Sequence, residues 1–270
     1  MLEILDFEFM QNAFLAGLLI SIASGIIGSL IIINRMSFIA GGIAHGSYGG
    51  IGLALFFGIS PLLGALGFAI FLAVIFAFLG LKNKNRTDSL IGAIWAFGMA
   101  IGIIFTDLTP GYNTDLMSYL FGSIMSVPKS DIYALVGADI LFIAFILTFY
   151  KQILTLSFDT EFGALRGLNI KFLYYLMIIF VAIAVIASVQ IVGLILVIAL
   201  LTIPPFIAEK FSSNLFLMMI NSSIISAVFC ILGLGASYYL NLTSGAAIIL
   251  IATLAFFATN IILSLKKDNL

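Results

Sequence analysis

The chain has 270 residues, of which 63% are hydrophobic and 9% are charged, and its formal net charge is −1. This composition excludes an ordinary soluble domain and indicates an all-α, multi-pass integral membrane protein with one transmembrane domain over residues 1–270. The single cysteine, Cys230, lies inside an apolar run and cannot form an internal disulfide.

Taken in chain order, the sequence contains nine apolar runs of helical length, and each predicts a membrane-spanning helix. The runs cover residues 13–33, 37–57, 61–80, 89–106, 131–150, 171–189, 191–208, 215–239 and 243–264. Turn-forming and polar residues separate them, as at 58–61 and 82–88. About nine membrane helices are therefore expected.

Basic residues predict the orientation, because they accumulate in short cytoplasmic loops. With the N-terminus outside and the C-terminus inside, Lys129 is the only basic residue expected on the outer side. The ten on the inner side are Arg35, Lys82, Lys84, Arg86, Lys151, Arg166, Lys171, Lys210, Lys266 and Lys267. This layout requires residues 107–130 to stay outside, so Asp115 to Val127 is predicted to be a short helix that dips into the outer leaflet without crossing.

The stretch from Arg35 to Gly52 holds the only histidine of the chain, set among six glycines. At about 1.5 Å per residue, His45 lies roughly 15 Å into its helix, near the middle of a bilayer core about 30 Å thick. A histidine at that depth is a candidate pathway residue that coordinates a transition metal transiently. The alternative is tight helix packing through Gly42, Gly46 and Gly50, with a neutral imidazole bonded to a neighbouring carbonyl.

Asp139, about nine residues into the fifth run, is the other ionisable candidate inside a span. It can line the same pathway, pair with an outer polar group or stay protonated, and the sequence leaves these alternatives open. Gln190 and Gly193 predict a break between the sixth and seventh spans. Pro204-Pro205 predict a disruption at the inner end of the seventh span.

The longest polar interruption facing inside is residues 157–171, between the fifth and sixth spans. Asp159 or Thr160 can cap a helix of about two turns, with Glu161 in its first turn and Gly167 near its end. Such a helix could dock an apolar face on a soluble partner, or it could be a simple connector lying along the membrane. The apolar residues of this face are Phe162, Leu165 and Leu168.

The sequence has no GxxxxGK[ST] phosphate loop and no HExxH helix, so neither ATP binding nor zinc-protease chemistry is expected of it. An intramembrane enzyme would need a paired catalytic set, and His45 has no convincing partner within a turn. No catalytic site, bound cofactor or nucleic-acid partner is therefore expected of this chain. A secondary transporter or channel working alone would fit the hydropathy.

Six segments in one order along nearly the whole chain carry a resemblance. They are RMS at 35–37 followed by AH at 44–45, DSLIG at 88–92, DLMSYLFGSIMSV at 115–127, FDTEFGALRG at 158–167, IVGLILVIALLTIPPFIA at 191–208, and TSGA at 243–246. Together they resemble the membrane permease subunits of ABC transporters for zinc and manganese. A related permease for a metal chelate is the alternative within the same class.

The resemblance implies a homodimer in the cell membrane, with a metal pathway along its centre. It also implies two cytoplasmic ABC ATPase subunits that hydrolyse ATP, and an extracytoplasmic metal-binding protein that delivers zinc or, as the second expectation, manganese. The pathway histidine of the family falls on His45, and its coupling helix falls on 158–168. The coupling residues expected from this match are Asp159, Glu161, Phe162, Gly163, Ala164 and Gly167.

Two positions depart from the family pattern. Many zinc and manganese members have an aspartate four residues before the histidine, where this chain has Gly41. Many also have a second histidine in the fourth span, where residues 94–97 read IWAF and Ala96 offers no ligand. Ligands at i and i+4 of a helix can grip a metal together, whereas His45 alone cannot.

Overall fold

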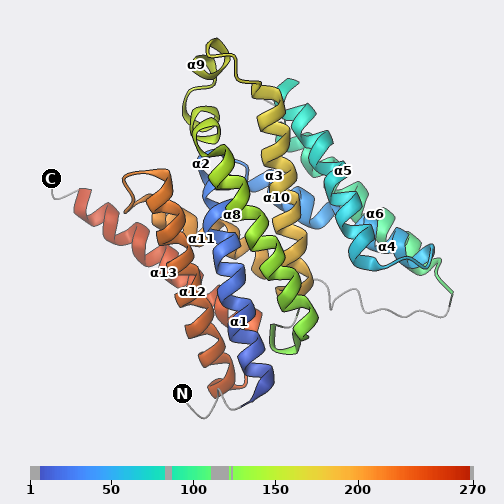
Figure 1. The fold of residues 1–270 in the computed structure, drawn as a ribbon. Helices are drawn as coiled ribbons and strands as arrows, with labels where there is room; N and C mark the ends of the chain where they lie inside the picture. The colour runs from blue at the N-terminus through green and yellow to red at the C-terminus, as the bar shows by residue number, and fades with distance from the viewer. Residues whose placement is uncertain (1–6, 83–86, 111–121, 123, 268–270) are drawn as a thin grey trace.

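The computed structural model describes residues 7–82, 87–110, 122 and 124–267, and this part of the chain is helical with no strand (Figure 1). Eight of its helices are long and apolar enough to cross a membrane. They are Glu8–Ile33, Ser37–Phe56, Pro61–Lys82 (α5), Thr87–Asp107 (α6), Lys129–Phe158 (α8), Ile170–Val192 (α10), Leu215–Leu240 (α12) and, within α13 (Ser244–Lys267), Ser244–Leu265. The all-α membrane fold is confirmed.

The remaining predicted run forms α11 (Leu194–Glu209), which has 16 residues and is shorter than the others. At about 1.5 Å per residue it measures roughly 24 Å, somewhat less than a bilayer core. Two spans contain irregular steps. The first comprises α1 (Glu8–Ala23), a π-helical segment η2 (Ser24–Gly28) and α2 (Ser29–Ile33), and the second comprises α3 (Ser37–Gly46) and α4 (Tyr48–Phe56).

Helices α8 and α10 pack against each other in the middle of the molecule, and the short helix α9 (Thr160–Leu165) joins them at one end (Figure 1). On one flank, α4 packs against α5 and α6, and α5 also packs against α10. On the other flank, α12 packs against α1, α11 and α13. Of the eight long helices, the first, second and sixth predicted spans are the most buried, and they form the interior together with the shorter α11.

An ion pair fixes the direction of α1 relative to α8. Glu8 and Lys129, at the first turns of these two helices, lie 2.8 Å apart. The first turns of α1 and α8 thus share one end of the molecule, opposite α9 (Figure 1). The predicted orientation, which puts the N-terminus and Lys129 on the outer side, stays a prediction.

Glycines let the second span approach its neighbours closely. A Cβ at Gly50 would meet the backbone oxygen of Gly64 in α5, and one at Gly52 would meet the backbone of Gly102 in α6. Close contacts also lie beside Gly42 and Gly46, where an added Cβ would meet side chains of α5 or α6. The predicted small-residue packing of this span is confirmed.

The prolines of α11 do not interrupt it, so the predicted disruption at Pro204-Pro205 was wrong: the helix runs unbroken from Leu194 to Glu209. Pro204 has no N–H for the carbonyl of Leu200, one turn earlier. The Ser24 hydroxyl, at the start of η2, donates a hydrogen bond to that carbonyl instead. A donor from another helix therefore replaces the missing backbone donor.

The predicted break between the sixth and seventh spans is confirmed at Gly193. This residue has φ of +79° and separates α10, which ends at Val192, from α11, which begins at Leu194. Residues with a side chain rarely adopt this backbone conformation, so a glycine is suited to the position.

The predicted outer-leaflet helix from Asp115 to Val127 falls largely outside the described residues. Its described part includes a 3-10 turn, η3 (Ile124–Ser126), whose Ile124 is buried. The turn packs against α1. The end of this segment is therefore anchored to the first span.

Candidate functional site

His45 lies at the last turn of α3, just before the step at Ser47 that separates α3 from α4. The residue is half-buried, and its imidazole stacks on the indole of Trp95 in α6, with ring centroids 4.2 Å apart and ring planes 16° from parallel. Nδ1 is buried without a hydrogen-bond partner among the described residues. The alternative of an imidazole bonded to a neighbouring carbonyl is therefore not seen at Nδ1.

The indole of Trp95 is itself held in place. Its Nε1 donates to the sulfur of Met99, one turn later in α6, at 3.0 Å, and its ring lies 6.1 Å from that of Phe38. Residues four apart on a helix share a face, so α6 presents Trp95 and Met99 together. His45, Trp95, Met99 and Phe38 form what we call the α3–α6 cluster.

The surroundings of His45 hold no set of protein ligands for a resident metal. Within the described ranges, no group of three or more His, Cys, Asp and Glu side chains could bind a metal ion together. One turn before His45, a Cβ built on Gly41 would meet nothing within 4 Å. The site can thus offer an ion one imidazole and open space beside it, which suits brief contact rather than storage.

Asp139 lies on a different helix interface from His45. It is 4% exposed, and neither carboxylate oxygen has a hydrogen-bond partner among the described residues. Its helix, α8, packs mainly against α1 and α10, whereas α3 packs mainly against α6 and α10. The outer polar partner considered for Asp139 is therefore not found in this part of the chain.

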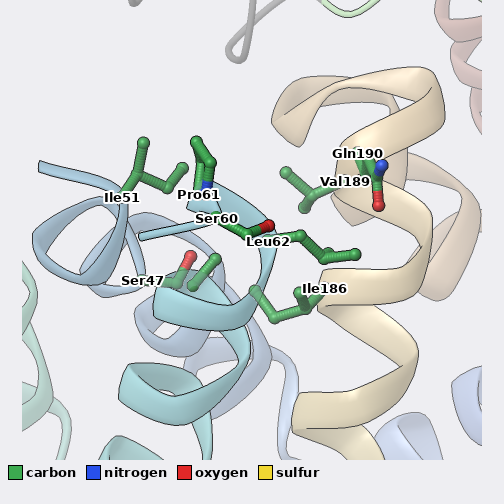
Figure 2. Close-up of a pocket in the computed structure, with 9 residues that line it drawn as sticks. Ser47, Ile51, Ser60, Pro61, Leu62, Ile186, Val189 and Gln190 are labelled. Carbon is green, nitrogen blue, oxygen red and sulfur yellow. The ribbon is translucent and has the colours of Figure 1, made fainter. Parts of the chain in front are cut away.

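A cavity of about 170 Å³ opens between α4, the start of α5 and the end of α10 (Figure 2). Figure 2 shows Ile186 and Val189 facing the turn of Pro61 and Leu62, with Gln190 at the edge. Its lining is Ser47, Ile51, Ser60, Pro61, Leu62, Ala65, Ile186, Val189 and Gln190. Sequence reasoning missed it because its polar groups come from three separate segments and follow no motif.

The first residue that lines this cavity is Ser47, two residues after His45. The Ser47 side chain lines it, while its hydroxyl donates to the Ala44 carbonyl at 2.7 Å. The Gln190 amide nitrogen donates to a carboxylate oxygen of Asp131 at 3.4 Å. Residues two apart on a helix point to nearly opposite sides, so the cavity and the α3–α6 cluster flank the second span on different faces.

The short helix predicted within residues 157–171 is confirmed as α9, Thr160–Leu165. Asp159 is its N-cap, because its side chain accepts a hydrogen bond from the backbone N–H of Phe162 at 2.9 Å. The end is closed by Gly167, with φ of +78°, and by a bond of 3.0 Å from the Leu168 N–H to the Gly163 carbonyl. Asp159 rather than Thr160 therefore caps the helix.

The faces of α9 differ in exposure. Leu165 is 88% exposed and Phe162 is 46% exposed, with the Arg166 guanidinium 4.7 Å from the Phe162 ring centroid. Gly163 is buried instead: a Cβ there would lie 2.9 Å from Cδ1 of Ile170 and 3.0 Å from Cγ2 of Thr155. Among the expected coupling residues, Glu161, Phe162 and Ala164 are exposed, whereas Gly163 is buried against the neighbouring helices. Asp159 and Gly167 lie at the two ends of the helix. Leu168, expected in the docking face, is half-buried against the core.

A second cavity of about 400 Å³ lies beside α9. Thr160 of α9, Arg35 and Met36 before α3, Asp88 of α6 and Tyr174 of α10 all contribute to its walls. Arg35 turns the chain from α2 into α3 with a φ of +56°. Thus α9 and the start of the helix that carries His45 border the same space.

Proteins of known sequence and structure resemble this chain over most of its length. An uncharacterised membrane protein of Synechocystis sp. is 47% identical, with 95% of this chain and 91% of the relative covered. The manganese transport system membrane protein MntC of Listeria monocytogenes is 34% identical, with 94% and 90% covered. The solved structure of PsaBC from Streptococcus pneumoniae in complex with Fab contains a chain with a TM-score of 0.84 and 30% identity, covering 95% of this chain and 94% of that one.

A match to a protein family is consistent with the similarity to these relatives. The sequence model of the ABC 3 transport family matches residues 6–263, which include the eight long apolar helices of the described residues and α11, but for the last residues of α13. With eight helices of membrane-spanning length and composition, the chain is a multi-pass membrane protein that belongs to the ABC 3 transport family.

Proposed function

We propose that this chain is the membrane permease subunit of an ABC importer for a divalent transition metal ion. The observation that carries the proposal is α9, a capped helix whose Leu165 is 88% exposed at the end of the molecule opposite the N-terminus. An apolar side chain so exposed fits a groove on a soluble partner. The partner proposed here is a cytoplasmic ABC ATPase, which supplies the ATP hydrolysis that this chain has no motif to perform.

The path from α9 to the ion pathway runs through packed helices. Gly163 rests on Thr155 of α8 and Ile170 of α10, so moving α9 displaces the ends of both helices. Helix α10 packs against α3, and the 400 Å³ cavity leaves room for the start of α3 to shift. We propose that closure of the ATPase pair on two copies of this chain moves His45 in this way.

Two metals are candidate cargo, and a different observation favours each. Imidazole nitrogen without a nearby carboxylate suits zinc better than manganese, which prefers oxygen ligands, and Gly41 leaves His45 without a carboxylate at i−4. The relative named as a manganese transport system membrane protein, at 34% identity, favours manganese. An extracytoplasmic metal-binding protein would deliver either ion.

The test is ATP-dependent accumulation of zinc, manganese and iron in vesicles containing this chain, its ATPase and its binding protein, with each component omitted in turn. Accumulation of one ion that needs all three components is the expected result, and direct competition between zinc and manganese then identifies the cargo. Flux without the ATPase would overturn the proposal in favour of a transporter working alone. Absence of metal flux, with uptake of a chelate instead, would overturn the free-ion assignment.

A further inference from the structure

The only tryptophan of the chain lies on its only histidine, with nearly parallel rings and centroids 4.2 Å apart. We infer that Trp95 is the positioning residue of His45: it holds the imidazole so that Nε2 alone meets the passing ion. This inference rests on the proposed function, since it gives His45 a role in the ion pathway. Neither the family pattern nor the spacing of residues in the sequence assigns a role to Trp95.

A histidine that ligates a metal ordinarily donates its other ring N–H to a carbonyl, a carboxylate or water, which fixes the ring orientation and the tautomer. Here Nδ1 is buried and has no such partner among the described residues. A buried nitrogen cannot reach an ion in the pathway, so Nε2 is the nitrogen that remains for ligation.

Stacking supplies the orientation that the missing hydrogen bond would give. The two ring planes are 16° from parallel, so rotating the imidazole about its Cβ–Cγ bond would drive its edge into the indole. Flat rings in this arrangement attract each other beyond the area that they bury. The ring of His45 is thereby kept in one plane without using either nitrogen.

Trp95 can hold the imidazole because it is itself fixed at both ends. The indole N–H is bonded to Met99 Sδ at 3.0 Å. The backbones beneath the two rings meet at Gly46 and Gly98, where a Cβ on Gly98 would lie 2.9 Å from Cα of Gly46. The separation of α3 and α6 is therefore set by backbone contact, which places the two rings at stacking distance.

The first experiment measures zinc and manganese uptake by the complete transporter. Trp95→Ala is expected to raise the apparent KM for the ion about tenfold, the lower range for losing a group that orients a metal ligand, with little change in protein level. Trp95→Phe keeps an aromatic face for stacking and is expected to restore most of the affinity. The matched control is Phe71→Ala in α5, which removes a 57% exposed aromatic side chain away from His45.

The second experiment uses Trp95 as its own reporter, since no other tryptophan contributes to the emission. Adding Mn²⁺ or Zn²⁺ to the purified protein is expected to change that emission, and His45→Ala is expected to abolish the change. Met99→Leu, which frees the indole N–H at similar volume, is expected to weaken the response while the protein still folds. This variant keeps the inference testable if Trp95→Ala fails to insert.

The outcomes separate the inference from the proposed function. If His45→Ala transports normally, the pathway role of His45 fails, and the inference fails with it. If His45→Ala loses uptake while Trp95→Ala and Trp95→Phe both match the wild type in KM, the pathway stands and the positioning role is overturned. Equal losses in Trp95→Ala and Phe71→Ala would also overturn it, because they would show a general packing effect.

Discussion

The hydroxyl of Ser24 donates its hydrogen bond to the carbonyl of Leu200, the acceptor that Pro204 leaves without a backbone donor. Ser24 opens the π-helical segment of the first span, and Gly28 closes that segment against Pro205. In an apolar surrounding an unsatisfied carbonyl is costly, so the donor has to come from another helix. One bond between the first and seventh predicted spans thus keeps α11 continuous.

Ser24→Ala is expected to destabilise the protein by about 1–3 kcal/mol, the cost of leaving a buried acceptor unpaired. Pro204→Ala restores an N–H for Leu200, so the same serine substitution in a Pro204→Ala background should cost much less. Thermal unfolding of the four variants in detergent measures this cycle. Ser226→Ala is the control, because its buried hydroxyl has no hydrogen-bond partner in the described part of the chain and its removal should be neutral or stabilising. Additive losses would contradict the exchange of donors.

Gly41→Asp is expected to increase affinity for the ion at His45. The new Cβ would meet nothing within 4 Å, and the added carboxylate lies one helical turn from the imidazole. Added ligation worth about 1.4 kcal/mol would lower the apparent KM about tenfold, and more for manganese than for zinc because manganese prefers oxygen ligands. Uptake assays with both ions measure the change.

Gly41→Ala is the control for that variant, since it adds the Cβ without a ligand. An equal change in the alanine and aspartate variants would show that helix stability, rather than coordination, is responsible. A lower KM accompanied by a slower maximal rate would match a pathway that now holds its ion too long.

Leu165→Ser is expected to abolish most stimulation of the ATPase by this chain without lowering its melting temperature. The leucine is 88% exposed, so the free protein loses little buried area, while the docking face of α9 loses its most prominent apolar group. ATPase assays on the reconstituted complex measure the effect. Leu242→Ser, at a 49% exposed leucine in the turn between α12 and α13, should leave the stimulation unchanged.

Gly163→Val is expected to uncouple ATP hydrolysis from uptake while the protein still inserts. Its added atoms would press on Ile170 and Thr155 and push α9 away from the ends of α8 and α10. Gly137→Val, in α8 where a Cβ meets nothing within 4 Å, is the matched control. Loss of insertion in the Gly163 variant alone would show that the glycine serves folding rather than coupling.

Several features could be predicted from the sequence because their causes are local. The length of the apolar runs predicted the spans, and Asp159 and Gly167 predicted the two ends of α9. Gly193 predicted the break before α11. Each depends on a residue and its neighbours within a turn or two. The predicted disruption at Pro204-Pro205 was wrong for the complementary reason, because the Leu200 carbonyl receives its hydrogen bond from Ser24, 176 residues before Leu200 in the chain.

By itself, then, the sequence determined a helical membrane protein with one histidine deep in a glycine-rich span and one capped helix outside the spans. Only the tertiary structure decided that His45 meets Trp95, that Asp139 lies on another interface, and that Ser47 and Gln190 border one cavity. Apolar helices fit lipid and protein equally well, so composition does not reveal how each helix is rotated about its axis. Close backbone packing at the glycines sets that rotation, and with it the surroundings of the histidine.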